Sequence, residues 1–193
     1  MPVNAENARI FGSDDDAVSI APLGSTLPED LSELTAPFVD AGWLHSDGIT
    51  LGGDTSVTRF RGHQGGKVIR TKVTEANKTF QFQCLETTAT TLGLQFHIKD
   101  QTTASGTATL TVSAGARVEA RAFVVDVFDV DGRAEPVHYR YVIPRGEIGE
   151  RSEFRMVNSD ITGYTFTVEV IDEFFIITND PAVVGEDTEP EEG

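Results

Sequence analysis

The chain has 193 residues, of which 31 are acidic and 15 basic, with a formal net charge of −16 and one cysteine. A chain of this length can bury one core, and a single cysteine excludes an intramolecular disulfide. The acidic balance argues against sequence-specific nucleic-acid binding, which needs a basic surface to neutralise phosphates. No apolar run approaches the roughly 20 residues of a membrane span, and the N-terminus lacks a secretory signal. We therefore expect a soluble protein that is made in the cytoplasm and has no membrane partner.

The first forty residues predict one short strand. The run AVSIAP at residues 17–22 follows three aspartates at residues 14–16, which we interpret as a solvated turn in preference to a metal site. Residues 1–12 are polar and suit an extended arm. The segment after Pro28 allows one helical turn, because proline fits the first position of a helix.

Residues 42–73 form the least regular stretch of the sequence. It opens with the only tryptophan and continues through a polar, glycine-rich segment at residues 47–66 that has little apolar periodicity. About twenty residues without clear structure are unusual in a compact domain and are often functional. We predict that residues 44–66 form a long extended loop that reaches another surface. The side chains assigned to this contact are Trp43, Ile49, Val57, Arg59, Phe60, Arg61, His63 and Lys67.

Basic side chains gather in and just after this loop. Two interpretations stay open: the cluster meets an acidic face of another copy of the chain, or it binds phosphate groups. The strongly negative overall charge repels nucleic acid, which favours the first interpretation. The cluster consists of Arg59, Arg61, Lys67, Arg70 and Lys72.

Two strand-like runs follow the loop. Residues 67–74 and 78–86 predict strands joined by a short hairpin turn. In the second run, Phe80 and Phe82 alternate with glutamines, which is typical of a half-buried strand. Cys84 continues the apolar side of this alternation, so we expect a small buried side chain there.

One helix is predicted, at residues 87–97. Thr87 or Thr88 can cap its start, since threonine accepts hydrogen bonds from the first turn. Residues 100–106 then predict a loop. The helical face expected to be buried consists of Leu85, Ala89, Leu92 and Phe96.

The C-terminal half is rich in strands. Residues 117–130 and 135–143 predict a long hairpin, which Pro144 and Gly146 are expected to end. Residues 181–193 are acidic and contain proline, which predicts a disordered tail. On the returning strand, Val137, Tyr139, Tyr141 and Ile143 share one face, with His138 and Arg140 opposite. Further strands are predicted at residues 107–112, 153–157 and 164–170.

Together these patterns predict a mainly β protein. We expect an antiparallel β-sandwich or barrel-like domain at residues 1–180, with one short flanking α-helix and the long extended loop. Strands with one apolar and one polar face can bury the apolar face within one subunit. Their exposed edges invite pairing with another chain, and pairing around a ring would close a large barrel.

The sequence lacks the motifs of common active sites. The four histidines have no paired metal-ligand spacing, and there is no nucleophile elbow or phosphate-binding loop. Residues 129–132 share part of a calcium-loop pattern, but Val127 and His138 stand where that loop needs acidic ligands. We therefore expect no catalytic residue, no metal and no cofactor. The histidines are His45, His63, His97 and His138.

Five sequence blocks resemble a known family. The strings NAENARIFG, APLGSTLP, DAGWLHSDGIT, FRGHQGGKVIRTKVTE and TFQFQCLETTATTLGLQF occur in this order within residues 4–96. Their order and combination resemble the major tail protein, or tail tube protein, of siphophages, especially those infecting actinobacteria. The later half of the chain agrees with the family in pattern more than in wording.

This resemblance implies a structural virion protein. Its subunits would form hexameric rings that stack into the tube of a long non-contractile tail, with the loop at residues 44–66 reaching the neighbouring ring. The tube would hold the tape-measure protein, meet tail terminator and distal tail proteins at its ends, and pass DNA during ejection without specific binding. Four strands, at residues 67–74, 78–86, 117–130 and 135–143, would line the lumen. The chain ends too soon for the immunoglobulin-like domain of some relatives.

Two further expectations depend on the resemblance. An acidic lumen would pass DNA without trapping it, and the candidate lumen-facing charges are Glu86, Glu119, Asp126 and Glu135. The alternative is that these side chains are ordinary solvated surface. Deleting residues 47–66 is expected to leave folded subunits that do not polymerise.

Other classes remain as alternatives. A tail terminator or completion protein would cap the tube and give rings without long polymers. A capsid-decoration or adhesion β module would need a pocket of exposed aromatic side chains, and the one tryptophan gives that interpretation little support.

Overall fold

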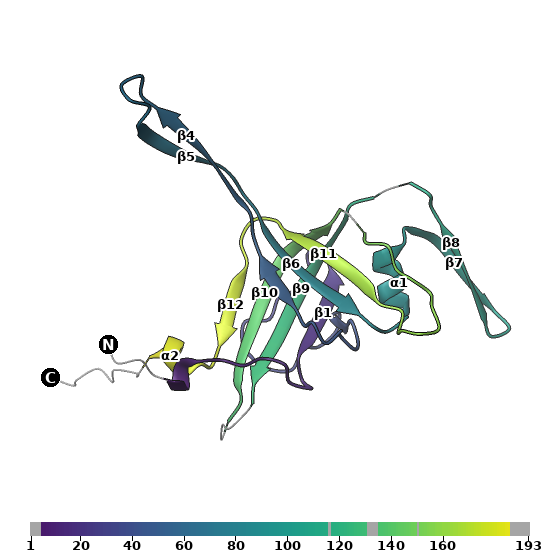
Figure 1. Cartoon of the computed structure of the whole chain (residues 1–193). Coiled ribbons are helices and arrows are strands. Elements are labelled where there is room, and N and C mark those ends of the chain that lie inside the picture. The colour runs from purple at the N-terminus through teal and green to yellow at the C-terminus, as the bar shows by residue number, and fades with distance from the viewer. Residues whose placement is uncertain (1–4, 116, 131–134, 150, 186–193) are drawn as a thin grey trace.

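The computed structural model describes residues 5–115, 117–130, 135–149 and 151–185 (Figure 1). The chain is mainly β, as predicted, with antiparallel strands, two short α-helices and a short 3-10 helix (Ala5–Asn7) among the described residues. One large sheet forms the body, and two separate hairpins stand apart from it.

Within the described residues, the body sheet has eight strands in the order β2-β1-β9-β10-β11-β6-β3, with β12 also paired to β10. All the pairs are antiparallel. The strands are β1 (Ala17–Pro22), β2 (Val39–Asp40), β3 (Thr50–Gly52), β6 (Lys78–Cys84), β9 (Glu119–Asp129), β10 (Val137–Ile148), β11 (Tyr164–Val170) and β12 (Phe175–Thr178).

The segment between β2 and β3 joins the two edges of this sheet. The Ala41 amide donates to the Val18 carbonyl of β1 at 2.8 Å. A few residues later, the His45 amide donates to the Gln83 carbonyl of β6 at 2.9 Å. Leu44 also forms a bridge with Cys84. One segment therefore bonds to strands from both ends of the sheet, which gives the body a barrel-like closure.

Aromatic side chains fill the core. The predicted alternation on β6 is confirmed, because Phe80, Phe82 and Cys84 are buried. The Phe80 ring stacks on Phe82 at 5.5 Å and meets Phe123 of β9 edge-on at 5.2 Å. Burial raises the pKa of the Cys84 thiol to about 12, so this cysteine is inert near neutral pH.

The long β9–β10 hairpin is confirmed, although its turn at residues 131–134 lies outside the described residues. The prediction that Pro144 and Gly146 end the second strand is wrong, since β10 continues to Ile148 through a register shift between Ile143 and Gly146. Such an irregularity lets a strand accommodate proline. A Cβ at Gly146 would lie 2.5 Å from the Val168 side chain, so the core requires glycine there.

The predicted helix is confirmed as α1 (Ala89–Gln95), but its buried face is not the predicted one. Thr88 caps the helix in a capping box with Thr91. The Thr91 hydroxyl also donates to the Glu86 carbonyl at 2.9 Å, which turns this side of the helix inward. Thr91 and Leu94 are consequently its buried residues.

Two hairpins stand apart from the body sheet, and each combines a strand that was predicted, at residues 67–74 or 107–112, with a strand in a segment predicted as a loop. The first is β4 (Thr55–Arg61) with β5 (Val68–Ala76), and the second is β7 (Ile98–Ala104) with β8 (Thr107–Val112). β5 pairs with β4 and not with β6, so the predicted hairpin turn at residues 75–77 is wrong, as is the loop at residues 100–106. Residues 67–74 consequently lie outside the body sheet.

Two smaller predictions also fail. Residues 23–36 contain bends and turns without a helix, and residues 153–157 contain no strand. At the start of the tail that was predicted to be disordered, α2 (Pro181–Val184) forms one helical turn, and the prediction for residues 186–193 falls outside the described part. The turn at Asp14 and Asp15 agrees with the sequence analysis.

Asp180 fixes the beginning of α2 to the N-terminal segment. Its carboxylate caps the helix by accepting the Ala182 amide at 2.8 Å. It also accepts hydrogen bonds from Arg9 Nε at 2.7 Å and from the Tyr139 hydroxyl. The hydrogen bond from the Arg9 guanidinium holds the pKa of Asp180 well below its usual range.

We expect the Asp180→Asn substitution to lower the free energy of unfolding by about 2 kcal/mol at pH 7, since it removes hydrogen bonds to a charged acceptor. The folded-state pKa of Asp180 is depressed, so its contribution is fully present above the unfolded value of about 3.9 and is lost as pH falls below that value. Urea unfolding between pH 7 and pH 3 checks this. The gap between the two proteins should shrink in acid, and a gap that widens there contradicts the assignment.

Candidate functional site

The first candidate surface is the hairpin of β4 and β5, residues 55–76, which we call the basic hairpin. It projects from the body in Figure 1, and its strands pair only with each other among the described strands. It contains five basic residues and one acidic residue. The whole chain has 15 basic and 31 acidic residues, so ten basic and thirty acidic residues lie outside the hairpin. The basic hairpin therefore has a formal charge of +4, and the remainder of the chain −20.

Apolar and basic side chains share the surface of the basic hairpin. Phe60 lies opposite Arg70. Phe60 is 52% exposed, and Ile69, which a register shift leaves without a cross-strand partner, is 73% exposed. A two-stranded hairpin alone is at best marginally stable in water, and exposed apolar patches mark interaction sites. These side chains are therefore suited to contact with another surface.

The tip of the basic hairpin closes on itself. The Gly62 amide donates to the Lys67 carbonyl at 2.9 Å, and Arg61 Nη1 donates to the Gly66 carbonyl at 2.9 Å. Gly65 and Gly66 have φ angles of 71° and 63°, where a side chain would strain the backbone. The turn thus takes its shape from its own residues, without support from the body.

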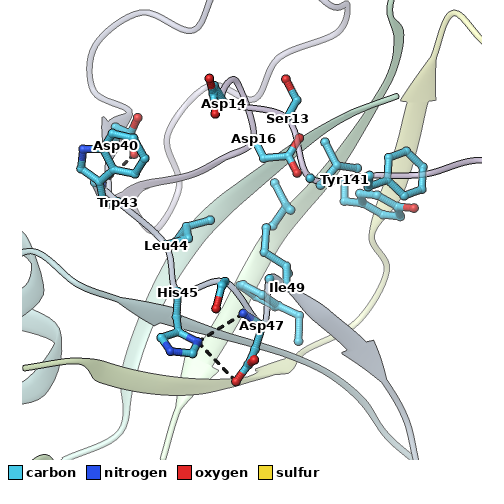
Figure 2. A pocket seen from close by; sticks show the side chains of 18 of the residues that line it. Ser13, Asp14, Asp16, Asp40, Trp43, Leu44, His45, Asp47, Ile49 and Tyr141 are labelled. Atoms are coloured by element: carbon cyan, nitrogen blue, oxygen red, sulfur yellow. Dashed lines mark hydrogen bonds and ion pairs between the residues drawn. The ribbon is translucent and has the colours of Figure 1, made fainter. Parts of the chain in front are cut away.

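The second candidate surface is a cavity of about 820 Å³ in the body. Most of its lining residues come from two segments, within residues 11–16 and 40–51. In Figure 2, Ser13 and Asp14 lie across the cavity from His45 and Asp47. Apolar side chains line it, among them Phe80, Val125, Val127, Tyr141 and Ile143. We call it the acidic cavity because five carboxylates also line it, those of Asp14, Asp16, Asp40, Asp47 and Glu86.

Hydrogen bonds hold the walls of the acidic cavity in place. Glu86 Oε1 accepts the Trp43 amide at 2.9 Å, and Asp16 Oδ1 accepts the Phe128 amide at 2.8 Å. Burial raises the pKa of Asp16, although the hydrogen bond from the Phe128 amide opposes this shift. Gly42 has a φ of 83°, and a Cβ there would lie 2.6 Å from the Glu86 carboxyl carbon. The wall therefore requires glycine at this position.

The structure divides the predicted contact residues between these two surfaces. Trp43 and Ile49 line the acidic cavity, where Trp43 is 70% exposed and Ile49 packs against the core. The other six lie on the basic hairpin: Val57, Arg59, Phe60, Arg61, His63 and Lys67. The sequence analysis missed the cavity as a unit, because its walls meet only after β1, β6, β9 and β10 have paired.

Two of the four acidic residues predicted to face a lumen are buried in ion pairs. Asp126 accepts hydrogen bonds from Arg140 Nε at 2.7 Å and pairs with His138 Nε2 at 2.6 Å. Glu119 pairs with Arg121. Neither is therefore a solvated charge in the single subunit. Glu135 is exposed, and Glu86 is half-buried at the acidic cavity.

Within the described ranges, no group of three or more histidine, cysteine or acidic side chains is placed to hold a metal ion. No helix in the same ranges is long and apolar enough to cross a membrane.

The architecture is that of a mainly β protein with a projecting, charged hairpin. A family model described as phage tail tube protein matches residues 1–182, and the chain belongs to that family. It is accordingly a structural protein of the phage tail and part of the virion, which confirms the resemblance to a phage tail tube protein. A comparison with curated protein sequences finds no match.

Proposed function

We propose that this chain is the major tail tube subunit of a siphophage that infects an actinobacterium. Copies made in the host cytoplasm form hexameric rings, and the rings stack into the tube of a long non-contractile tail. The tube encloses the tape-measure protein, ends at terminator and distal tail proteins, and conducts DNA during ejection. The protein has no enzymatic role.

The single observation that carries this proposal is the basic hairpin. Its seven-residue strand β4 reaches about 23 Å at the usual rise per residue. A contact between this hairpin and a different patch on the next copy is heterologous, and such contacts produce rings or open polymers. The opposite charges of the hairpin and the remaining chain favour contact between copies.

Negative-stain electron microscopy of the purified protein over a concentration series tests the proposal. We expect long hollow tubes of uniform width, with the onset of assembly dependent on concentration. Discrete closed rings at every concentration would instead indicate a tail terminator. Particles that stay monomeric even when purified tail-initiation complexes are added would contradict the proposed function.

A further inference from the structure

We propose that the acidic cavity of one copy is the receptor for the basic hairpin of another copy. This inference deepens the proposed function, because it identifies the surface that receives the hairpin and so sets how neighbouring copies are joined. The argument rests on charge, on apolar complementarity and on the direction of the hairpin.

Charge complementarity supports the pairing. The basic hairpin has a formal charge of +4, whereas the acidic cavity is lined by five carboxylates and only one residue of basic type, His45. Asp47, with its side chain 90% exposed, stands at the opening beside His45. Opposite charges on two surfaces steer encounter and fix register, even where the net gain in affinity is modest.

Apolar complementarity supports it as well. The cavity is lined by the hydrocarbon side chains of Val125, Val127 and Ile143 as well as by the acidic residues. The basic hairpin carries Phe60 and Ile69 exposed among its basic residues. About 820 Å³ lies in the range of pockets that bind compact ligands, which is room for a few side chains and not for a whole hairpin. Phe60 and Ile69 are the side chains suited to enter.

The hairpin cannot enter the cavity of its own chain in the described conformation. Leu51 of β3 lines the cavity, and β4 begins four residues later. From that point the basic hairpin runs away from the body (Figure 1). The occupant must therefore come from a second copy, and each copy then offers one hairpin and one cavity. A contact that joins two different surfaces head to tail can repeat into a ring or an open polymer.

Trp43 offers an exposed indole ring on which an arginine of the hairpin can stack. Its ring is 70% exposed at the cavity, although tryptophan is among the residues with most to gain from burial. An arginine over the face of an indole ring contributes about 0.5–1 kcal/mol at an exposed site. Arg59 and Arg70 flank the exposed apolar residues of the hairpin and are the candidates for this stacking.

Disulfide trapping in the full chain tests the inference. One variant carries Gln64→Cys at the hairpin tip and another carries Ser46→Cys at the cavity, and the two are mixed with diamide as oxidant. The matched control pairs Gln64→Cys with Thr109→Cys on the exposed β8 strand. The native Cys84 is buried in every variant and does not compete. We expect the tip–cavity disulfide to form at least about tenfold faster than the tip–β8 disulfide, and to slow as salt screens the charges.

Charge exchange provides the second arm. Reversing two hairpin charges, Arg59→Glu with Arg70→Glu, should slow trapping about tenfold. Reversing two cavity charges in the partner variant, Asp14→Lys with Asp47→Lys, should restore the rate of trapping. Lys99→Glu, an exposed reversal on β7, is the matched control and should leave the rate unchanged.

The outcomes separate this inference from the proposed function. Tubes that form without preferential tip–cavity trapping would overturn the receptor assignment and leave the tube function standing. Preferential trapping with only closed rings would support the receptor and contradict the long tube. Equal trapping at the cavity and at β8, or charge exchange that fails to restore the rate, also overturns the inference.

Discussion

Shortening the basic hairpin is expected to give a folded subunit that no longer forms tubes. In the shortened variant, residues 57–74 are replaced by Asn-Gly, so that Ser56 and Glu75, which already face each other, flank a two-residue turn. The melting temperature should change by no more than about 4 °C, because most of the removed side chains are exposed and exposed residues contribute little to stability. Tube formation should fall below detection in electron microscopy and sedimentation.

The control for this experiment is Gln64→Ser at the exposed tip, which should polymerise as the unmodified chain does. The shortened variant should also fail to join tubes when mixed with the unmodified chain, because it lacks the hairpin half of the contact. Tubes of normal length from the shortened variant alone would exclude the hairpin as the joining element.

The structure changes the design that the sequence suggested. A deletion of residues 47–66 would remove β3, which pairs with β6, and would also remove Ile49 and Leu51 from the acidic cavity. That deletion damages the body and the acidic cavity together, so a loss of polymer would not show that the hairpin joins the subunits. Replacing residues 57–74 leaves both intact.

The sequence predicts best where one face of a strand is buried. On β6 and β11, apolar residues alternate with polar ones, and the structure confirms both strands. The basic hairpin and the β7–β8 hairpin are exposed on both faces, so neither has an apolar alternation to detect. The two register shifts in β4–β5 disturb the period further. The sequence analysis therefore found one strand of each hairpin, at residues 67–74 and 107–112, and missed the partner strand.

The polar face of β10 is buried as well. His138 and Arg140 alternate with apolar residues, as the sequence analysis noted, and both are buried. They are compensated by Asp126 of β9, which faces Arg140 in the strand register. Burial of charge is tolerated where the charges are paired and hydrogen-bonded. Alternation alone distinguishes two faces of a strand, but it does not show whether the polar face meets water or a partner.

The second large effect, on the free energy of unfolding, is expected at this buried cluster of Asp126, His138 and Arg140. Arg140 donates to Asp126 through Nε at 2.7 Å and also to the carbonyls of Asp30 at 2.9 Å and Ser32 at 2.8 Å. The arginine thus ties the segment at residues 23–36 to the body. The Asp126→Ala substitution would leave the guanidinium of Arg140 without a carboxylate partner, and Arg140 is only 3% exposed. We expect the free energy of unfolding to fall by about 3–5 kcal/mol, as for other buried pairs that lose one partner.

Urea unfolding followed by circular dichroism measures this loss, and an unchanged slope with urea would show that the mutant unfolds from a similarly compact state. The matched control is Asp47→Ala, whose side chain is 90% exposed, with an expected change within about 0.5 kcal/mol. The loss of unfolding free energy for Asp126→Asn should lie between those of Asp126→Ala and Asp47→Ala, since the amide oxygen still accepts one hydrogen bond. A loss below about 1 kcal/mol for Asp126→Ala would mean that water or a neighbouring group solvates Arg140. In that case Asp126 would again be a candidate for a solvated charge on the tube surface.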